Sequence, residues 1–129
     1  MSSRLSVSSI CFCTSKALSD KFLCHSELYR FFTLFSLIAS IASLWEIAIK
    51  IELGKLDIQR PFENLETDLQ RLDIKILPIA FSDVQIYRAL PLHHRDPFDR
   101  ILIAQSISNN LMIITRDALF KPYLVELMW

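Results

Sequence analysis

Two aspartates, Asp96 and Asp99, lie three residues apart within the run HHRDPFDR at residues 93–100. The run leads into an apolar stretch of helical character, so both carboxylates fall on one face of a first helical turn. Two further carboxylates, Glu46 and Asp117, accompany other apolar segments. Ionised carboxylates beside an apolar core are costly unless a partner compensates them. A ligand set of oxygens without cysteine favours Mg²⁺ or Mn²⁺ over zinc or copper.

Each carboxylate also has a purely structural explanation. Asp96 precedes a proline and has the position of a helix N-cap, and Asp99 complements the helix dipole. Glu46 lies three residues after Ser43, as the back-reaching member of a capping box does, and Asp117 suits a turn after a strand. For any one residue the structural explanation is the simpler. The combination favours a metal site that activates water and stabilises phosphoryl oxygens.

Composition limits the remaining classes of protein. The chain has 129 residues, 52% of them hydrophobic, and equal numbers of basic and acidic residues, so one ordered domain without a global basic field is expected. Its single glycine, Gly54, excludes a phosphate-binding loop and a dinucleotide fingerprint. Three cysteines, Cys11, Cys13 and Cys24, form neither a disulfide framework nor a zinc pattern, which indicates a reducing cytoplasm.

Neither of two apolar segments has the form of a membrane or secretion signal. The serine-rich stretch from Leu5 to Cys13 is followed by no small-residue cleavage site. The uncharged stretch from Phe31 to Trp45 is shorter than the roughly 20 residues that span a bilayer, and Glu46 ends it. We therefore expect a buried segment there and no membrane association.

Hydrophobic periodicity predicts alternating helices and short buried strands from residue 43 onward. The expected helices run from Ser43 to Gly54, from Pro61, from Ser82 to Pro91 and from Pro97 to about Ser108; the expected strands cover residues 74–77, 111–114 and 125–129. This alternation is typical of an α/β fold with a parallel sheet, which binds ligands beyond the C-terminal ends of its strands. Asp117 falls at such an end. No first strand can be placed in the N-terminal 40 residues.

Three segments resemble the PIN-domain ribonucleases, and most closely their VapC-type toxin branch. They are SLWEIAIKIELGKL (Ser43–Leu56), LPLHHRDPFDRILIAQ (Leu90–Gln105) and LMIITRD (Leu111–Asp117). The resemblance implies an α/β, PIN-like three-layer sandwich with a short parallel sheet flanked by helices. It places a PIN domain at residues 39–129, after an atypical segment at residues 1–38.

The same resemblance implies a function and a set of site residues. It implies a cytoplasmic endoribonuclease that hydrolyses RNA phosphodiester bonds with Mg²⁺ or Mn²⁺, forms a homodimer and is silenced by a small VapB-like antitoxin. The positions that match the family's acidic residues are Glu46, Asp99 and Asp117, with Asp96 as an accessory metal ligand. Nearby arginines then hold RNA phosphates, or else are ordinary surface arginines: Arg95, Arg100 and Arg116. His93 and His94 either orient substrate or form a hydrated loop pair.

The chain departs from the family at its N-terminus. PIN domains of this branch open with a short apolar strand that ends in a catalytic aspartate within an LLDTH-like run, and this sequence has none. Its first aspartate, Asp20, lies in a segment similar to the linker after that strand. The missing carboxylate should weaken Mg²⁺ binding. We hypothesise a changed or rearranged reading frame upstream of about Ile38; the absence of an LLDTH-like strand from the other two frames of the DNA would refute this.

Three functions therefore stand side by side. The first is the metal-dependent ribonuclease toxin. The second, favoured for this chain by the missing aspartate, is a degenerate PIN module that binds an antitoxin without cleaving RNA. The third is a membrane-associated or structural protein that uses the apolar residues 31–49.

Overall fold

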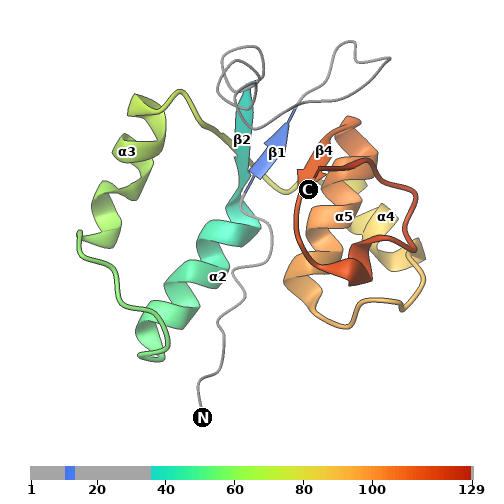
Figure 1. Ribbon diagram of the computed structural model, residues 1–129, viewed down its shortest axis with the longest axis horizontal. Coiled ribbons are helices and arrows are strands. Elements are labelled where there is room, and N and C mark those ends of the chain that lie inside the picture. Colours follow the sequence, from blue (N-terminus) through green and yellow to red (C-terminus); the bar gives the residue numbers. More distant parts are fainter. Residues whose placement is uncertain (1–10, 14–35, 129) are drawn as a thin grey trace.

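Short strands and intervening helices build an α/β fold in the computed structural model, which describes residues 11–13 and 36–128 (Figure 1). The strands are β1 (Cys11–Cys13), β2 (Leu37–Ser40), β3 (Lys75–Leu77), β4 (Met112–Ile114) and β5 (Leu127–Met128). The helices are α2 (Ile41–Glu52), α3 (Leu65–Arg71), α4 (Phe81–Ala89) and α5 (Pro97–Asn109), with the 3-10 turns η1 (Phe62–Asn64) and η2 (Ala118–Phe120).

The five strands form one sheet in the order β3-β2-β1-β4-β5. β2 and β3 are parallel, as are β4 and β5, whereas the central β1 is antiparallel to both β2 and β4. The four outer strands therefore share one direction, and their C-terminal ends lie at one edge of the sheet. The prediction of an α/β, PIN-like fold with short parallel strands is confirmed.

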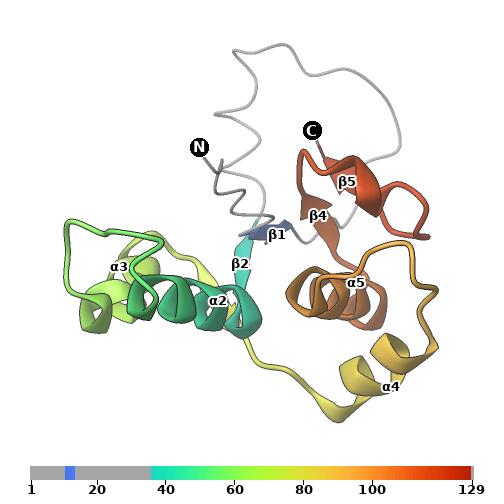
Figure 2. The same cartoon turned by 90° about the horizontal axis from the view of Figure 1, so that it is seen from below.

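The helices form two groups around the sheet. Figure 2 shows α2 and α3 beside the β2 end, and α4 and α5 toward the β4–β5 end. Two buried clusters match these groups: one joins Leu102 and Ile103 of α5 to Ile113 and Phe120, and the other joins Ala39 and neighbouring leucines of α2 and α3. Burying each large aliphatic side chain contributes about 1.5–3 kcal/mol. The prediction that α5 is buried on most sides is confirmed.

Helix α2 begins earlier than the sequence predicted. Its N-cap is Ser40, whose hydroxyl accepts the Ala42 N–H at 3.1 Å, so the capping box predicted for Ser43 and Glu46 is wrong. Ser40 ends β2 in an extended conformation, which the N-cap position requires, whereas Ser43 lies buried within the helix. Gly54 follows the helix with φ 65°, as expected of a residue that ends a helix.

The helix predicted from Pro61 is divided into the 3-10 turn η1 and the helix α3, which begins at Leu65. The remaining boundaries shift by one or two residues. α4 begins at Phe81 instead of Ser82, and the Asp83 carboxylate accepts the Ala80 N–H at 2.7 Å. Asn110 ends α5 in the left-handed conformation at φ 52°. The last strand is limited to Leu127–Met128.

Several expectations concern the N-terminal region. Residues 37–45 of the uncharged stretch form β2 and the start of α2. Over the described residues, no helix is both long and apolar enough to cross a bilayer. Most of the predicted segment 1–38, including Asp20 and Cys24, lies outside the described residues.

A buried hydrogen-bond junction ties the start of α2 to α5. The Ser40 hydroxyl donates to Gln105 Oε1 at 2.5 Å, and Gln105 Nε2 donates to the Pro78 carbonyl at 3.1 Å. Both side chains are fully buried. The junction therefore satisfies polar groups that would otherwise be costly, and it couples the two helices that carry site residues.

The variant Ser40→Ala should lower the free energy of unfolding by about 2–3 kcal/mol, because it removes an N-cap and leaves the buried Gln105 carbonyl oxygen without its donor. Urea denaturation measures this change. The exposed Ser82, whose hydroxyl contacts the exposed Ser108, supplies the control: Ser82→Ala should stay within about 0.5 kcal/mol of the wild type. Equal effects of the two substitutions would contradict the assigned junction.

Candidate metal centre

Three side chains from separate elements converge beyond the C-terminal end of β4. Asp99 comes from the first turn of α5, Asp117 lies three residues after the end of β4, and His94 comes from the loop between α4 and α5. His94 Nε2 lies 3.1 Å from Asp99 Oδ2 and 3.0 Å from Asp117 Oδ2. One ligand atom from each residue falls within 4.8 Å of the others, a spacing that could hold a metal ion.

Capping hydrogen bonds fix the carboxylates of Asp96 and Asp117. Asp96 is the N-cap of α5, and its carboxylate accepts the Phe98 N–H at 2.8 Å, which holds Asp99 in the first turn. Asp117 caps η2: its Oδ1 accepts the Leu119 N–H at 2.9 Å. The structural explanations of Asp96 and Asp117 are therefore correct, but each carboxylate also lies near Asp99.

Asp99 is the most perturbed group of the site. It is 3% exposed, and burial raises its pKa from 3.8 to about 7. His94 acts in the opposite direction, while the negative charges of Asp96, Glu46 and Asp117 raise the pKa further. Its Oδ1 atom is buried without a hydrogen-bond partner among the described residues. A bound cation is one partner that could satisfy such a buried carboxylate oxygen.

Glu46 lies at the margin of this cluster. It forms an ion pair with Lys50 on the next turn of α2, and its charge acts on Asp99. The neighbouring Trp45 ring meets the Phe98 ring edge-on at 5.3 Å between centroids, which joins α2 to the start of α5. The structure thus brings Glu46 toward Asp99, although only Asp99 and Asp117 share the close contact with His94.

Arg100 has a structural position that does not fit the predicted RNA contact. It is 5% exposed, and its guanidinium donates to four backbone carbonyls, those of Tyr87, Leu90, Pro91 and His94. These carbonyls belong to the end of α4 and the following loop, where a helix leaves acceptors unsatisfied. Arg95 and Arg116, by contrast, are exposed next to the aspartates.

Sequence reasoning missed the importance of His94 and Tyr123. The expectation of a hydrated histidine pair is wrong for His94, which is 5% exposed, whereas His93 is exposed and packs edge-on against the Tyr123 ring. The Tyr123 hydroxyl accepts the His94 N–H and donates to the Pro91 carbonyl, both at 2.8 Å. No pattern in the sequence marks Tyr123; the proximity of His94 to the DPFD run was the only signal for the histidine.

The central strand supplies no carboxylate to this edge of the sheet within the described residues. β1 is Cys-Phe-Cys, and its register pairs Cys11 with Ile114. Because β1 runs against its neighbours, its N-terminal end lies at the site and its C-terminal end lies at the opposite edge. A carboxylate that followed β1 directly would therefore not reach the position that the family resemblance implies.

Comparison with known proteins identifies the family of the chain. The sequence matches the PIN domain family over residues 22–123. The chain belongs to the PIN domain family. This membership indicates a nuclease-type function, and PIN domains typically depend on divalent metals. No curated protein and no solved structure gives a significant match. The division of the PIN domain from an atypical segment at residues 38/39 stays a prediction.

The residues present fit the divalent cation that PIN domains typically use. The carboxylates of Asp99 and Asp117 are close together, and the Asp99 Oδ1 atom has no partner among the described residues. Glu46 adds a third nearby negative charge. Oxygen ligands of this kind suit Mg²⁺ or Mn²⁺, and Asp99 and Asp117 are the residues that would hold the ion.

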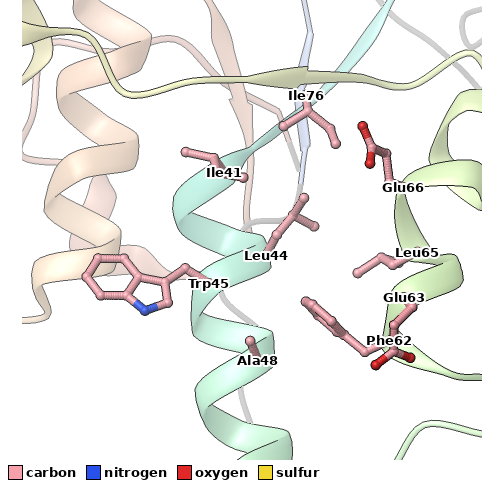
Figure 3. Close-up of a pocket in the computed structure, with 9 residues that line it drawn as sticks. All are labelled: Ile41, Leu44, Trp45, Ala48, Phe62, Glu63, Leu65, Glu66 and Ile76. Atoms are coloured by element: carbon pink, nitrogen blue, oxygen red, sulfur yellow. The ribbon is translucent and has the colours of Figure 1, made fainter.

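A groove on the other side of α2 accompanies the site. Its volume is about 630 Å³, and its lining is mostly apolar: Ile41, Leu44, Trp45, Ala48, Phe62, Glu63, Leu65, Glu66 and Ile76. Figure 3 shows Phe62 and Leu65 directed toward α2 from the η1–α3 side, with Glu63 and Glu66 on that same wall. Trp45 is 60% exposed. The same helix thus contributes Glu46 to the site and one wall to the groove.

Asp99 should make the stability of the metal-free PIN domain fall as pH rises from about 4 to about 7. Its folded pKa is about 7, whereas an unfolded aspartate titrates near pH 4. The folded state therefore binds the proton more tightly, so stability is greatest below the unfolded pKa and declines until the folded pKa is passed. Urea denaturation in EDTA at a series of pH values measures the decline.

The variant Asp99→Asn supplies the comparison, since it removes this titration and should flatten the profile between pH 4 and pH 7. The exposed Asp57 gives a charge-matched control, and Asp57→Asn should keep the wild-type profile. Superimposable profiles for the wild type and Asp99→Asn would show that Asp99 does not titrate as the structure implies.

Proposed function

We propose that this PIN domain is a metal-dependent endoribonuclease of the VapC toxin type, which hydrolyses RNA phosphodiester bonds with Mg²⁺ or Mn²⁺. The observation that carries the proposal is the cluster around His94 Nε2, which lies 3.1 Å from Asp99 Oδ2 and 3.0 Å from Asp117 Oδ2. The other oxygen of Asp99, Oδ1, is buried and has no hydrogen-bond partner among the described residues. Family membership supports the nuclease class. The position of Asp117 after β4 also agrees with the rule that α/β proteins bind ligands beyond the ends of their strands.

The side chains of such a site have different roles. Asp99 and Asp117 bind the cation, and Glu46 adds negative charge from α2. Asp99, whose pKa burial raises to about 7, would hold the cation in its ionised form, because only the carboxylate is a metal ligand. Arg95 and Arg116 lie exposed beside these acids and hold the phosphates of the RNA backbone. The bound metal ion supplies charge that stabilises phosphoryl oxygens and activates water.

RNA cleavage by the purified protein should require added Mg²⁺ or Mn²⁺ and should stop in EDTA. Asp99→Asn and Asp117→Asn should each lower the rate on the order of a hundredfold or more, because a lost metal ligand removes several kcal/mol of transition-state stabilisation. Glu46→Gln should have a smaller effect, since Glu46 lies at the margin of the cluster. Cleavage of a labelled RNA measures these rates.

The exposed Asp57 again provides the control, and Asp57→Asn should cleave at the wild-type rate. Cleavage that persists in EDTA, or that survives both Asp99→Asn and Asp117→Asn, would rule out the proposed nuclease.

A second candidate function is antitoxin binding without cleavage. It is favoured by the composition of the central strand β1, whose described residues, Cys-Phe-Cys, supply no carboxylate to the site. A cation held by fewer carboxylates binds more weakly. Tight binding of the antitoxin by a protein that shows no cleavage at millimolar Mg²⁺ or Mn²⁺ would favour this candidate over the nuclease.

The partner proposed for either function is a small VapB-like antitoxin, for which the groove beside α2 is the binding surface. The apolar walls suit the apolar face of an amphipathic helix, and Glu63 and Glu66 on one wall suit basic residues along its edge. Ile41 and Trp45 of α2 also line the groove and are exposed, and Figure 3 shows them on the side of α2 away from Phe62 and Leu65, so only a partner that reaches across α2 would cover them. The homodimer implied by the family resemblance stays a prediction.

Reversing the charge of the two glutamates in the groove should weaken the complex with the proposed VapB-like antitoxin. We expect Glu63→Lys combined with Glu66→Lys to lower affinity by about tenfold or more, because like charges then oppose the basic edge of the partner. Glu52→Lys, at the exposed end of α2, is the matched control. Isothermal titration calorimetry measures the affinities. Equal affinities for the double variant and the control would place the partner elsewhere.

A further inference from the structure

We propose that His94 is a positioning residue of the metal site and not a metal ligand. Its ring is fixed with the proton on Nε2, and this N–H is donated to the two aspartates that face it. That the site holds a metal ion rests on the proposed function. The position of the proton on the His94 imidazole does not, because it is a property of the protein without metal. Three observations carry the inference.

The first observation is the hydrogen bond on the far side of the ring. The backbone N–H of Asp96 donates to His94 Nδ1 at 3.2 Å. A backbone amide can only donate, so Nδ1 accepts and carries no proton. A neutral imidazole then holds its proton on Nε2. Because Asp96 is the N-cap of α5, the beginning of the helix selects this tautomer.

The second observation is what Nε2 faces. It lies 3.1 Å from Asp99 Oδ2 and 3.0 Å from Asp117 Oδ2, so one N–H is shared between two carboxylates. The shared donor reduces the repulsion between two acids and sets the distance between them. The Oδ1 atom of Asp99 is the oxygen without a partner among the described residues. One oxygen of Asp99 is thus engaged by His94, and the other is left for the cation.

The third observation is that both the backbone and the ring of His94 are held in place. The backbone N–H of His94 donates to the Tyr123 hydroxyl at 2.8 Å, and Arg100 donates to the backbone carbonyl of His94 at 3.4 Å. The Phe120 ring meets the imidazole edge-on at 5.4 Å between centroids. Since His94 is 5% exposed, little room remains for the ring to rotate.

These constraints separate two explanations of the same cluster. A His-Asp-Asp group at this spacing has the composition of a site for zinc or another metal that favours imidazole. For His94 to bind a metal through Nε2, it would have to lose the Nε2 proton and both hydrogen bonds to the aspartates. As a donor it instead orients the carboxylates, a role that usually falls to groups surrounding the ligands of a metal.

Nuclear magnetic resonance of the intact, ¹⁵N-histidine-labelled protein tests the tautomer directly. Long-range ¹H–¹⁵N spectra in EDTA should show a protonated Nε2 and an unprotonated Nδ1 for His94, and saturation with Mg²⁺ should leave the Nε2 proton in place. The opposite tautomer in EDTA, or loss of the Nε2 proton with Mg²⁺, would overturn the proposal. The spectra require no nuclease activity, so a protein that fails to cleave RNA can still confirm the positioning role.

Two variants extend the test to metal affinity. His94→Phe keeps an aromatic ring without a donor and should weaken Mn²⁺ binding by about 10–100-fold, whereas His94→Gln keeps an N–H donor and should restore most of that affinity. The exposed neighbour provides the control, and His93→Gln should bind like the wild type. Calorimetry with Mn²⁺ and Zn²⁺ measures the affinities after circular dichroism has confirmed folding. A loss confined to Zn²⁺ in both His94 variants would identify a ligand and overturn the assignment; parallel losses for both metals in His94→Phe support it.

Discussion

Burial of the Asp99 carboxylate at the start of α5 is the constraint around which this end of the molecule is organised. The helix that carries it packs into the main core through Leu102 and Ile103, so the carboxylate cannot move out to water without displacing those side chains. A buried charge of this kind must be compensated by neutralisation, hydrogen bonding or a cation. The raised pKa, the contact with His94 and the lack of a partner for Oδ1 within the described residues are three consequences of the same placement.

The loop between α4 and α5 exists in its observed form because buried groups hold it. Arg100 satisfies carbonyls at the end of α4 and along the loop, and the Tyr123 hydroxyl bridges the His94 N–H and the Pro91 carbonyl. These contacts place His94 between Asp99 and Asp117. A side chain predicted to bind RNA, Arg100, thus contributes to the site through the backbone that it supports. The geometry of the cluster therefore depends on Arg100 and Tyr123, which contribute no ligand atom to it.

The directions of the strands determine which elements bring carboxylates to the site. β2 and β4 run the same way, so the helix that carries Glu46 and the turn that carries Asp117 start from the same edge of the sheet. β1 lies between them and runs the opposite way. Its described residues are Cys-Phe-Cys, so they supply no carboxylate to the centre of that edge. A metal ion at this PIN domain would therefore be held by carboxylates from the α5 and β4 side, with Glu46 at the margin.

The sequence by itself determined the order of helices and strands from residue 43 onward, because periodicity, proline and capping residues act over a few positions. It also determined Asp96 as an N-cap and identified Asp99 and Asp117 as candidate ligands. Only the tertiary structure decided which serine begins α2, where Arg100 points, and that His94 lies buried between two aspartates. Ser40 differs from Ser43 through its place after β2 and its bond to Gln105, which is 65 residues away. Such contacts join segments distant in the chain, and local patterns carry no information about them.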